Sequence, residues 1–167
     1  MKQLWKYIFL TVGIIILDQI TKGIIKSNFI LGESIPVIEG FFNITFVKNP
    51  GAAFGFFADA RDEIRKPLML ITPVAVSVWL VFQVRSTYKK NSLLTLAYCL
   101  IIAGAMGNFI DRFAYSYVID FLDFHYNNVH FPAFNVADSA ITIAAGLLIL
   151  DLIIIIKQER KSTKKNQ

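Results

Sequence analysis

Four apolar blocks divide this chain of 167 residues, and each block is about as long as a bilayer is thick. A helix needs about 20 predominantly apolar residues to cross the hydrocarbon core. Inside that core only helices and closed barrels satisfy all of their backbone hydrogen bonds. The blocks at residues 5–25, 67–84, 93–112 and 135–156 therefore predict an α-helical polytopic membrane protein with four transmembrane helices in a single membrane domain.

Composition and charge support this fold class. Charged residues make up 17% of the chain, against about 25% in ordinary soluble domains. The net charge of +5 comes mainly from lysines and arginines at segment ends, which indicates membrane anchoring and not a nucleic-acid surface. No small-x-small cleavage site follows the first block, so we expect it to be retained as a helix. The single cysteine, Cys99, excludes an internal disulfide and is expected to be a packing residue.

The basic residues also predict an orientation. Ten of the 17 lysines and arginines lie near the N-terminus, between the second and third blocks, or in the tail at 157–167. Because cytoplasmic loops are enriched in these residues, we expect both termini to be cytoplasmic and the site to lie near the outer face. The tail is expected to be disordered.

Residues 28–66 differ from the blocks. Residues 34–47 place β-branched and aromatic side chains in alternation around a Glu-Gly turn, which predicts a small β-sheet on the outer surface. In the segment 48–55, Gly51 permits a peptide backbone to approach closely, although an ordinary turn is the simpler interpretation. Residues 58–66 carry both signs of charge and predict a short interfacial helix.

Polar side chains interrupt the first and third blocks near one end. Asp18 and Lys22 are four residues apart and share a helix face, either as an ion pair at the interface or as a polar post facing the protein interior. Asn108 and Arg112 share a face in the same way and can orient carboxylates. An arginine at the lipid headgroups is the simpler interpretation of Arg112, but it leaves Asn108 unexplained.

Two aspartates give the strongest chemical signal, because carboxylates at membrane depth are costly and are functional suspects by default. Asp120 is flanked by apolar residues, where desolvation favours its protonated form. Asp138 and Asn135 fit a capping box, and a helix N-terminus favours an ionised Asp138. Such a pair suits acid–base hydrolysis, with either assignment of the two roles. Asp123 is the rival of Asp120; the two share a face in a helix and lie on opposite faces in a strand.

Other chemistries lack a complete set of residues. His125 and His130 are too few to hold a metal, and neither a metal nor a cofactor is expected. Ser139 and Cys99 have no base at a suitable spacing for nucleophilic catalysis. Asp151 lies thirteen residues after Asp138, so we expect it near the cytoplasmic end with only a local partner.

Five motifs, in order, make nearly the whole chain outside the tail resemble a known family. They are Asp18-Gln-Ile-Thr-Lys22, Asn49-Pro-Gly-Ala-Ala-Phe54, Gly104-Ala-Met-Gly-Asn-Phe-Ile-Asp-Arg112, Val118-Ile-Asp-Phe121 and Phe134-Asn-Val-Ala-Asp138. Together they resemble lipoprotein signal peptidase, also called signal peptidase II, a membrane aspartic peptidase family of bacteria. Two details depart from the family pattern: Ala103 stands where a second glycine is common, and Asp123 adds a carboxylate beside the site.

The resemblance implies a fold, an activity and a set of site residues. It implies four transmembrane helices with a β-cradle on the outer surface of the bacterial cytoplasmic membrane, and cleavage of prolipoprotein signal peptides just before a diacylglyceryl-modified cysteine. It also implies binding of membrane lipid and of globomycin-type inhibitors. The catalytic aspartates of the family fall on Asp120 and Asp138. The supporting and substrate-binding positions fall on Asp18, Lys22, Asn49, Gly51, Asn108, Arg112 and Asn135.

Two other function classes stay open at this point. Intramembrane carboxylates also mark proton-coupled carriers, but here they gather at one face and no inverted repeat is visible. A purely structural scaffold would leave Asn108, Asn135 and both aspartates unexplained.

Overall fold

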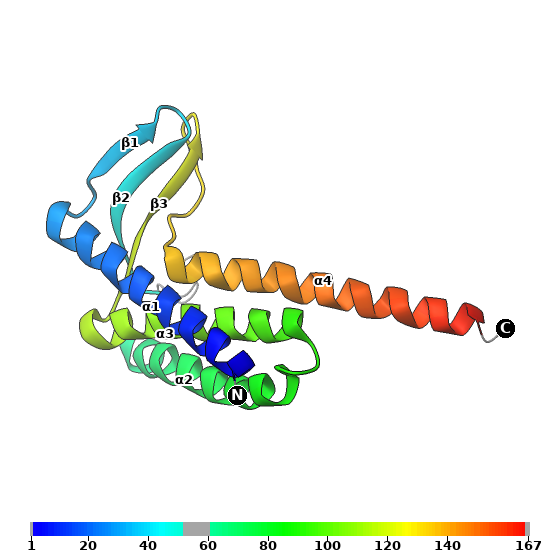
Figure 1. Cartoon of the computed structure of the whole chain (residues 1–167). Helices are drawn as coiled ribbons and strands as arrows, with labels where there is room; N and C mark the ends of the chain where they lie inside the picture. Colours follow the sequence, from blue (N-terminus) through cyan, green and yellow to red (C-terminus); the bar gives the residue numbers. More distant parts are fainter. Residues whose placement is uncertain (1, 52–60, 166–167) are drawn as a thin grey trace.

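Four long helices form the body of the protein, and a small antiparallel sheet lies at one end of them (Figure 1). The computed structural model describes residues 2–51 and 61–165. The helices are α1 (Lys2–Asn28), α2 (Asp62–Thr87), α3 (Ser92–Tyr115) and α4 (Val136–Lys165). Each is long and apolar enough to cross a membrane. The predicted fold class is therefore confirmed, and the chain is a multi-pass membrane protein.

Helix α3 lies at the centre of the bundle, in contact with α1, α2 and α4. Two glycines let its neighbours approach closely. A Cβ atom at Gly104 would clash with the carbonyl oxygen of Ala137 in α4, and one at Gly107 would lie 2.7 Å from a carboxylate oxygen of Asp18 in α1. Small residues at helix contacts are typical of membrane bundles. The backbones of three helices therefore meet around this part of α3.

The sheet contains strands β1 (Ser34–Ile38), β2 (Phe42–Asn49), β3 (Val118–Tyr126) and β4 (Val129–His130), in that order and antiparallel. The hairpin expected within residues 34–47 is present as β1 and β2. From the sequence, the segment between the third block and about Phe134 is expected to be a loop; this expectation is wrong in part, because residues 118–126 form β3. This strand pairs with β2, which lies two helices earlier in the chain, so its partner was not visible in the local pattern.

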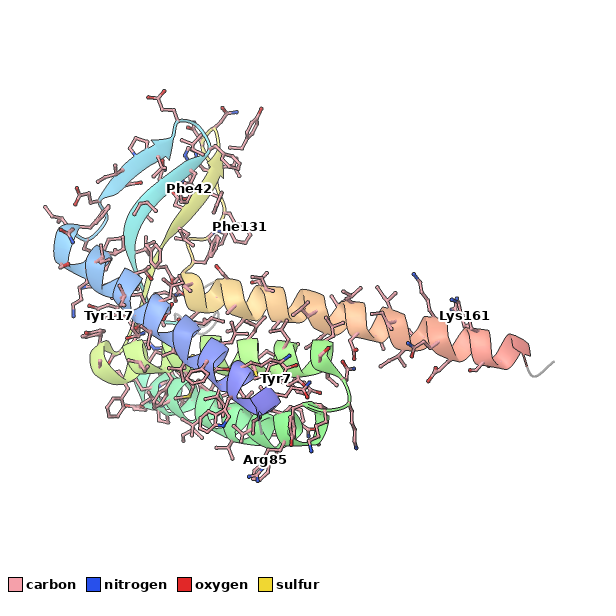
Figure 2. The ribbon with its side chains drawn as sticks, in the orientation of Figure 1. Tyr7, Phe42, Arg85, Tyr117, Phe131 and Lys161 are labelled. Atoms are coloured by element: carbon pink, nitrogen blue, oxygen red, sulfur yellow. The ribbon has the colours of Figure 1, made fainter. Side chains whose placement is uncertain are left out.

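The sheet extends sideways from one end of the bundle, which we call the sheet end (Figure 1). Ile25 of α1 packs against Phe46, Ile119 and Phe121 of the sheet and forms a hydrophobic cluster there. Figure 2 shows Phe42 at the sheet, and Arg85 and Lys161 toward the opposite end of the molecule. The apolar cluster therefore fixes the sheet to the last turns of α1.

Two expected boundaries differ from the structure. Residues 62–66 form the first turns of α2 and not a separate interfacial helix. Residues 58–60 of that predicted helix, and residues 52–55 of the predicted loop, lie outside the described residues. Helix α4 continues past Ile156 to Lys165, so the expectation of a disordered tail is wrong for residues 157–165. Lysine, arginine, glutamate and glutamine are good helix formers, and cations are favourable near a helix C-terminus.

Candidate active site

Asp120 and Asp138 lie on different elements and meet around one amide side chain. Asp120 is on β3 and 2% exposed, and Asp138 is in the first turn of α4. The Nδ2 of Asn135 donates to Oδ1 of Asp120 at 2.7 Å. The Oδ1 of Asn135 accepts the backbone N–H of Asp138 at 2.9 Å. The start of α4 therefore brings the two carboxyl groups to the same place.

Asp138 is held by N–H donors. Its Oδ2 accepts the backbone N–H of Asn135 at 3.3 Å, which completes the predicted capping box. Its Oδ1 accepts Nδ2 of Asn108, from α3, at 2.7 Å. Hydrogen bonds to a carboxylate are stronger than neutral ones, and a helix N-terminus also favours negative charge. The carboxyl group of Asp138 is therefore fixed in place by donors from α3 and from the start of α4.

Asp120 has a drier environment. The pKa of Asp120 is raised from its ordinary value of 3.8 to about 6, mainly by burial and in addition by the nearby charge of Asp138. Hydrogen bonds from Asn49 and Asn135 and the charge of Lys22 oppose this rise. The Nδ2 of Asn49, at the end of β2, donates to Oδ2 of Asp120 at 3.0 Å. Asp120 therefore keeps a proton at a higher pH than an ordinary aspartate.

Asp123 belongs to a different group of side chains. Because residues 118–126 are extended, side chains three residues apart point to opposite faces of the sheet. Asp123 accepts Nδ2 of Asn43 at 3.1 Å and lies 2.8 Å from Nδ1 of His130. The strand thus decides the question that the sequence left open, and it places Asp120, not Asp123, beside Asn135.

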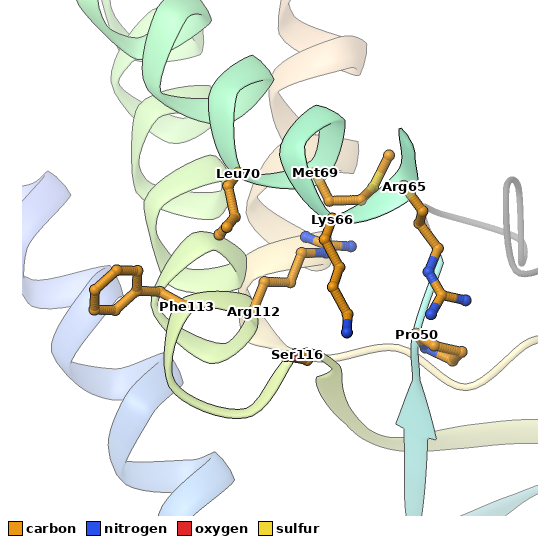
Figure 3. Close-up of a pocket in the computed structure, with 8 residues that line it drawn as sticks. All are labelled: Pro50, Arg65, Lys66, Met69, Leu70, Arg112, Phe113 and Ser116. Carbon is orange, nitrogen blue, oxygen red and sulfur yellow. The ribbon is translucent and has the colours of Figure 1, made fainter. Parts of the chain in front are cut away.

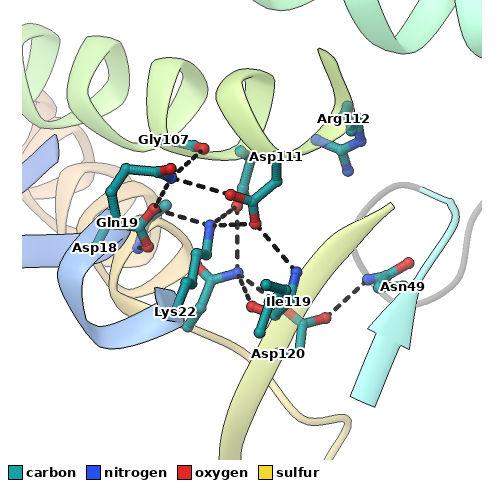
Figure 4. Close-up of polar contacts among 12 residues, drawn as sticks. Asp18, Gln19, Lys22, Asn49, Gly107, Asp111, Arg112, Ile119 and Asp120 are labelled. Carbon is teal, nitrogen blue, oxygen red and sulfur yellow. Dashed lines mark hydrogen bonds and ion pairs between the residues drawn. The ribbon is translucent and has the colours of Figure 1, made fainter. Parts of the chain in front are cut away.

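Asp18 and Lys22 form an ion pair of 2.8 Å that is fully buried (Figure 4). The pair faces the protein interior, as the second interpretation has it, and it is also the i,i+4 ion pair of the first. Lys22 Nζ also donates to Oδ1 of Asn108 at 3.0 Å. The other oxygen of Asp18 accepts the backbone N–H of Ala137 at 2.9 Å. The pair therefore supports the start of α4 and the side chain that holds Asp138.

Two further polar residues join this ion pair, and neither is predicted as a site residue from the sequence. Asp111 of α3 lies 3.0 Å from Lys22 Nζ. Gln19 of α1 donates to Oδ1 of Asp111 and to the carbonyl of Gly107, each at 3.0 Å. The sequence signal for Asp111 is its helical spacing. It follows Gly107 by one turn and Gly104 by two, which places it on the face where α3 approaches its neighbours.

Arg112 and Gly51 form the other side of the site. The Nη2 of Arg112 donates to the carbonyl oxygen of Gly51 at 2.7 Å, and the N–H of Gly51 donates to Oδ1 of Asn49 at 3.0 Å. The sequence predicts that Arg112 orients carboxylates, but the hydrogen bond described for it goes to the backbone carbonyl of Gly51. Its charge still acts on Asp120 and Asp138 through space. Arg112 links the Gly51 segment to α3.

Two cavities of mainly apolar lining open at Asp138. One, of about 480 Å³, lies among α2, α3 and α4, and it is lined in part by Asn108 and Arg112. The other, of about 520 Å³, lies between α4 and residues 131–134, and Asp120 is in its wall. Asn49, Asp138 and Ile141 line both cavities. Asp138 therefore faces apolar space on two sides, and Asp120 faces it on one.

A smaller pocket of about 200 Å³ lies beside the site, with Arg112 in its wall (Figure 3). Arg65 and Lys66 from the start of α2 line it together with Pro50. Its lining does not include Asp120 or Asp138, so it is a neighbour of the carboxylate site and not the site itself. Within the described residues, no group of three or more histidine, cysteine, aspartate or glutamate side chains is arranged to hold a metal ion.

Comparison with known proteins identifies the family. The sequence profile of the family described as Signal peptidase (SPase) II matches residues 10–154. The chain is 46% identical to a lipoprotein signal peptidase from Desulforapulum autotrophicum over 140 residues, which cover 84% of this chain and 86% of the relative. It is also 46% identical to the lipoprotein signal peptidase from Shewanella pealeana over 157 residues, which cover 94% of this chain and 91% of that relative.

Solved structures agree with this assignment. The fold is similar to that of a bacterial membrane enzyme determined by the in meso method at 2.3 Å resolution. The TM-score is 0.75 at 34% sequence identity, and the match covers 89% of this chain and 87% of that structure. A second structure of a bacterial membrane enzyme, determined by the in meso method at 1.9 Å resolution, has the same TM-score and sequence identity. That match covers 88% of this chain and 92% of the solved chain. The chain therefore belongs to the signal peptidase II family of peptidases.

Proposed function

We propose that this chain is an aspartic endopeptidase that removes the signal peptide from diacylglyceryl-modified prolipoproteins, with Asp120 and Asp138 as its catalytic pair. One observation carries the proposal. The two carboxyl groups share Asn135 at the point where two apolar cavities meet. An amphiphilic substrate can place its apolar parts in both cavities while its peptide bond lies at the carboxyl groups.

The environments of the two aspartates support a division of roles between them. Asp138, held by N–H donors at a helix N-terminus, acts as the base that removes a proton from water. Asp120, buried and more easily protonated, donates a hydrogen bond to the scissile carbonyl oxygen. The water oxygen bonds to the carbonyl carbon, and the C–N bond then breaks as the leaving nitrogen accepts a proton. The products are the signal peptide, which ends in a carboxylate, and a lipoprotein with a new amino terminus.

The substrate class follows from the cavities and from the relatives. Both cavities have apolar walls, which accept acyl chains and part of an apolar signal helix. The relatives are named lipoprotein signal peptidases. Cleavage just before the lipid-modified cysteine would leave the diacylglyceryl group beside Asp138. A globomycin-type cyclic peptide would compete for the same cavities.

We also propose that the sheet end faces the outer side of the cytoplasmic membrane. The excess of lysine and arginine lies at the opposite end, near both termini and in the turn between α2 and α3. Positively charged loops stay on the cytoplasmic side. In this orientation the carboxyl groups meet the signal peptide where it leaves the membrane on the outer side.

The direct test uses purified protein in detergent with a diacylglyceryl-modified prolipoprotein. We expect a shift to the mature size on a gel, and mass spectrometry should find the lipidated cysteine at the new N-terminus. The matched control is the same precursor with its cysteine replaced by serine, which cannot be lipidated and should stay uncut. An absence of turnover in detergent, or equal cleavage of both precursors, would contradict the proposal. A carrier would differ, because it needs a sealed membrane to show activity.

The pH dependence gives a second prediction. We expect kcat/KM of the wild-type enzyme to fall as pH rises through about 6, because the protonated form of Asp120 is then lost. For one essential acid the fall is about tenfold per pH unit. The rate should be followed from about pH 5 to about pH 9 in one detergent. A curve that stays level between about pH 6 and about pH 8 would contradict the role of Asp120 as the acid.

A further inference from the structure

Asp111 is a buried carboxylate that the proposed chemistry does not use. It lies in α3 between Asn108 and Arg112 and is 1% exposed. Its Oδ1 accepts Nε2 of Gln19 at 3.0 Å. Its Oδ2 is 3.0 Å from Lys22 Nζ and accepts the backbone N–H of Ile119 at 3.1 Å (Figure 4). Two carboxylate oxygens thus bind three donors from two other elements.

One of these donors leads to Asp120. Ile119 directly precedes Asp120 in β3, and its N–H bonds the Asp111 side chain. The carbonyl of Ile119 accepts Nδ2 of Asn135 at 3.3 Å, and the same Nδ2 donates to Asp120. Both peptide groups of Ile119 are therefore tied to the site. Asp111 holds the backbone from which the Asp120 side chain projects.

Another donor leads to Asp138. Lys22 bonds Asp111 and also donates to Oδ1 of Asn108 at 3.0 Å. Because this oxygen is occupied, the amide of Asn108 is oriented with its Nδ2 toward Asp138, to which it donates at 2.7 Å. Asp111 therefore acts on Asp138 through Lys22 and Asn108.

We propose that Asp111 is a positioning residue that sets the geometry of both catalytic carboxyl groups, through Ile119 for Asp120 and through Lys22 and Asn108 for Asp138. This inference rests on the proposed function, since it assumes that the two aspartates perform the reaction. Only a carboxylate fits the position, because an amide offers one acceptor oxygen and would turn its NH₂ group toward a donor. A misplacement of about 1 Å in such a site can cost about 10²-fold in rate.

Asp111 also contributes charge to the site. The charged groups facing this cluster are Asp18 and Lys22 from α1, Arg112 from α3, Asp138 from α4 and Asp120 from β3. An Asp111→Asn change removes one negative charge and leaves Lys22 less compensated. Both effects favour the ionised form of Asp120. The pH at which kcat/KM begins to fall should therefore decrease, which a loss of folded protein alone would not cause.

The test compares Asp111→Asn with Asp151→Asn in the purified full-length chain. Asp151 is a matched control because it is also a buried aspartate in a transmembrane helix, and it accepts Nδ2 of Asn91 at 2.7 Å. We expect Asp111→Asn to lower kcat by about 10- to 100-fold, with KM changed by less than about threefold. The falling limb of its pH profile should move to lower pH. Asp151→Asn should match the wild type in kcat and in pH profile.

A second variant separates geometry from charge. Asp111→Glu keeps the ion pair with Lys22 but moves the carboxylate by one methylene. We therefore expect a lower kcat, while the falling limb of the pH profile stays at its wild-type pH. The inference would be overturned if either Asp111 variant kept the wild-type kcat. It would also be overturned if Asp111→Asn lost rate while the falling limb of its pH profile stayed at the wild-type pH. If Asp111→Asn does not fold, the kcat of Asp111→Glu decides alone. Activity in both Asp120→Asn and Asp138→Asn would instead overturn the proposed function.

Discussion

We expect Asp120→Asn and Asp138→Asn each to lower kcat/KM for the lipidated precursor by about 10²- to 10⁴-fold. Asparagine keeps the size of the side chain but can neither remove a proton from water nor hold the acidic proton. Each change also keeps one oxygen that can accept the bond from Asn135 or Asn108, so the fold should be retained. Initial rates on a gel, with size-exclusion chromatography of each variant, give the measurement.

The matched control for this prediction is Asp123→Asn. Asp123 is buried on the same strand, only three residues from Asp120, but its contacts are Asn43 and His130. We expect this variant to keep kcat/KM within about threefold of the wild type. If Asp123→Asn lost activity while Asp120→Asn kept it, Asp123 and not Asp120 would be the catalytic aspartate. Cleavage by all three variants at the wild-type rate would contradict the aspartic mechanism.

The choice between Asp120 and Asp123 shows what local sequence can decide. Both aspartates have apolar neighbours, so composition alone ranks them weakly. The decision depends on whether the segment is extended, and β3 is extended because it pairs with β2 from before α2. In that register Val47 lies opposite Asp120, and Asn49 at the end of the same strand reaches the carboxyl group. A pairing between distant segments is not encoded in a local pattern.

Features that depend on short spacing were predictable. The four spans follow from the length of apolar runs, the Asn135–Asp138 capping box from a spacing of three, and the Asp18–Lys22 pair from a spacing of four. Asp111 was missed because its role depends on three donors from α1 and β3. The spacing of Asp111 from Gly104 and Gly107 marks a packing face of α3, but it does not identify these donors.

The polar side chains of the site form one connected network that reaches across the bundle. From α1, Lys22 contacts Asp18, Asp111 and Asn108, and Asn108 contacts Asp138. From α4, Asn135 contacts Asp120, which Asn49 also holds. In a medium without water such groups are tolerated when each finds a partner. The network therefore explains why polar residues that are costly in a membrane sit together at one end of this chain.

Lys22 is the sole cation described in the buried ion cluster, and its removal should have the largest effect on stability. We expect Lys22→Met to lower the free energy of unfolding by about 3–5 kcal/mol, because Asp18 and Asp111 would stay buried without a compensating charge. The measurement is denaturant unfolding in detergent micelles, followed by circular dichroism. The Oδ1 of Asn108 would keep Nδ2 of Asn135 at 3.2 Å but lose the charged donor Lys22, so the rate should fall in the remaining folded protein.

Two further variants make this prediction specific to buried charge. Arg61→Met breaks an ion pair of 3.1 Å with Glu63 in which both side chains are about four-fifths exposed, and it should leave stability unchanged within error. The triple variant Lys22→Met, Asp18→Asn, Asp111→Asn removes the uncompensated charges together with the cation. It should regain most of the lost stability but not the rate, since the carboxylate that holds the N–H of Ile119 and the ammonium group that bonds Asn108 would still be missing. If Lys22→Met unfolds like the wild type, the buried ion cluster does not stabilise the fold.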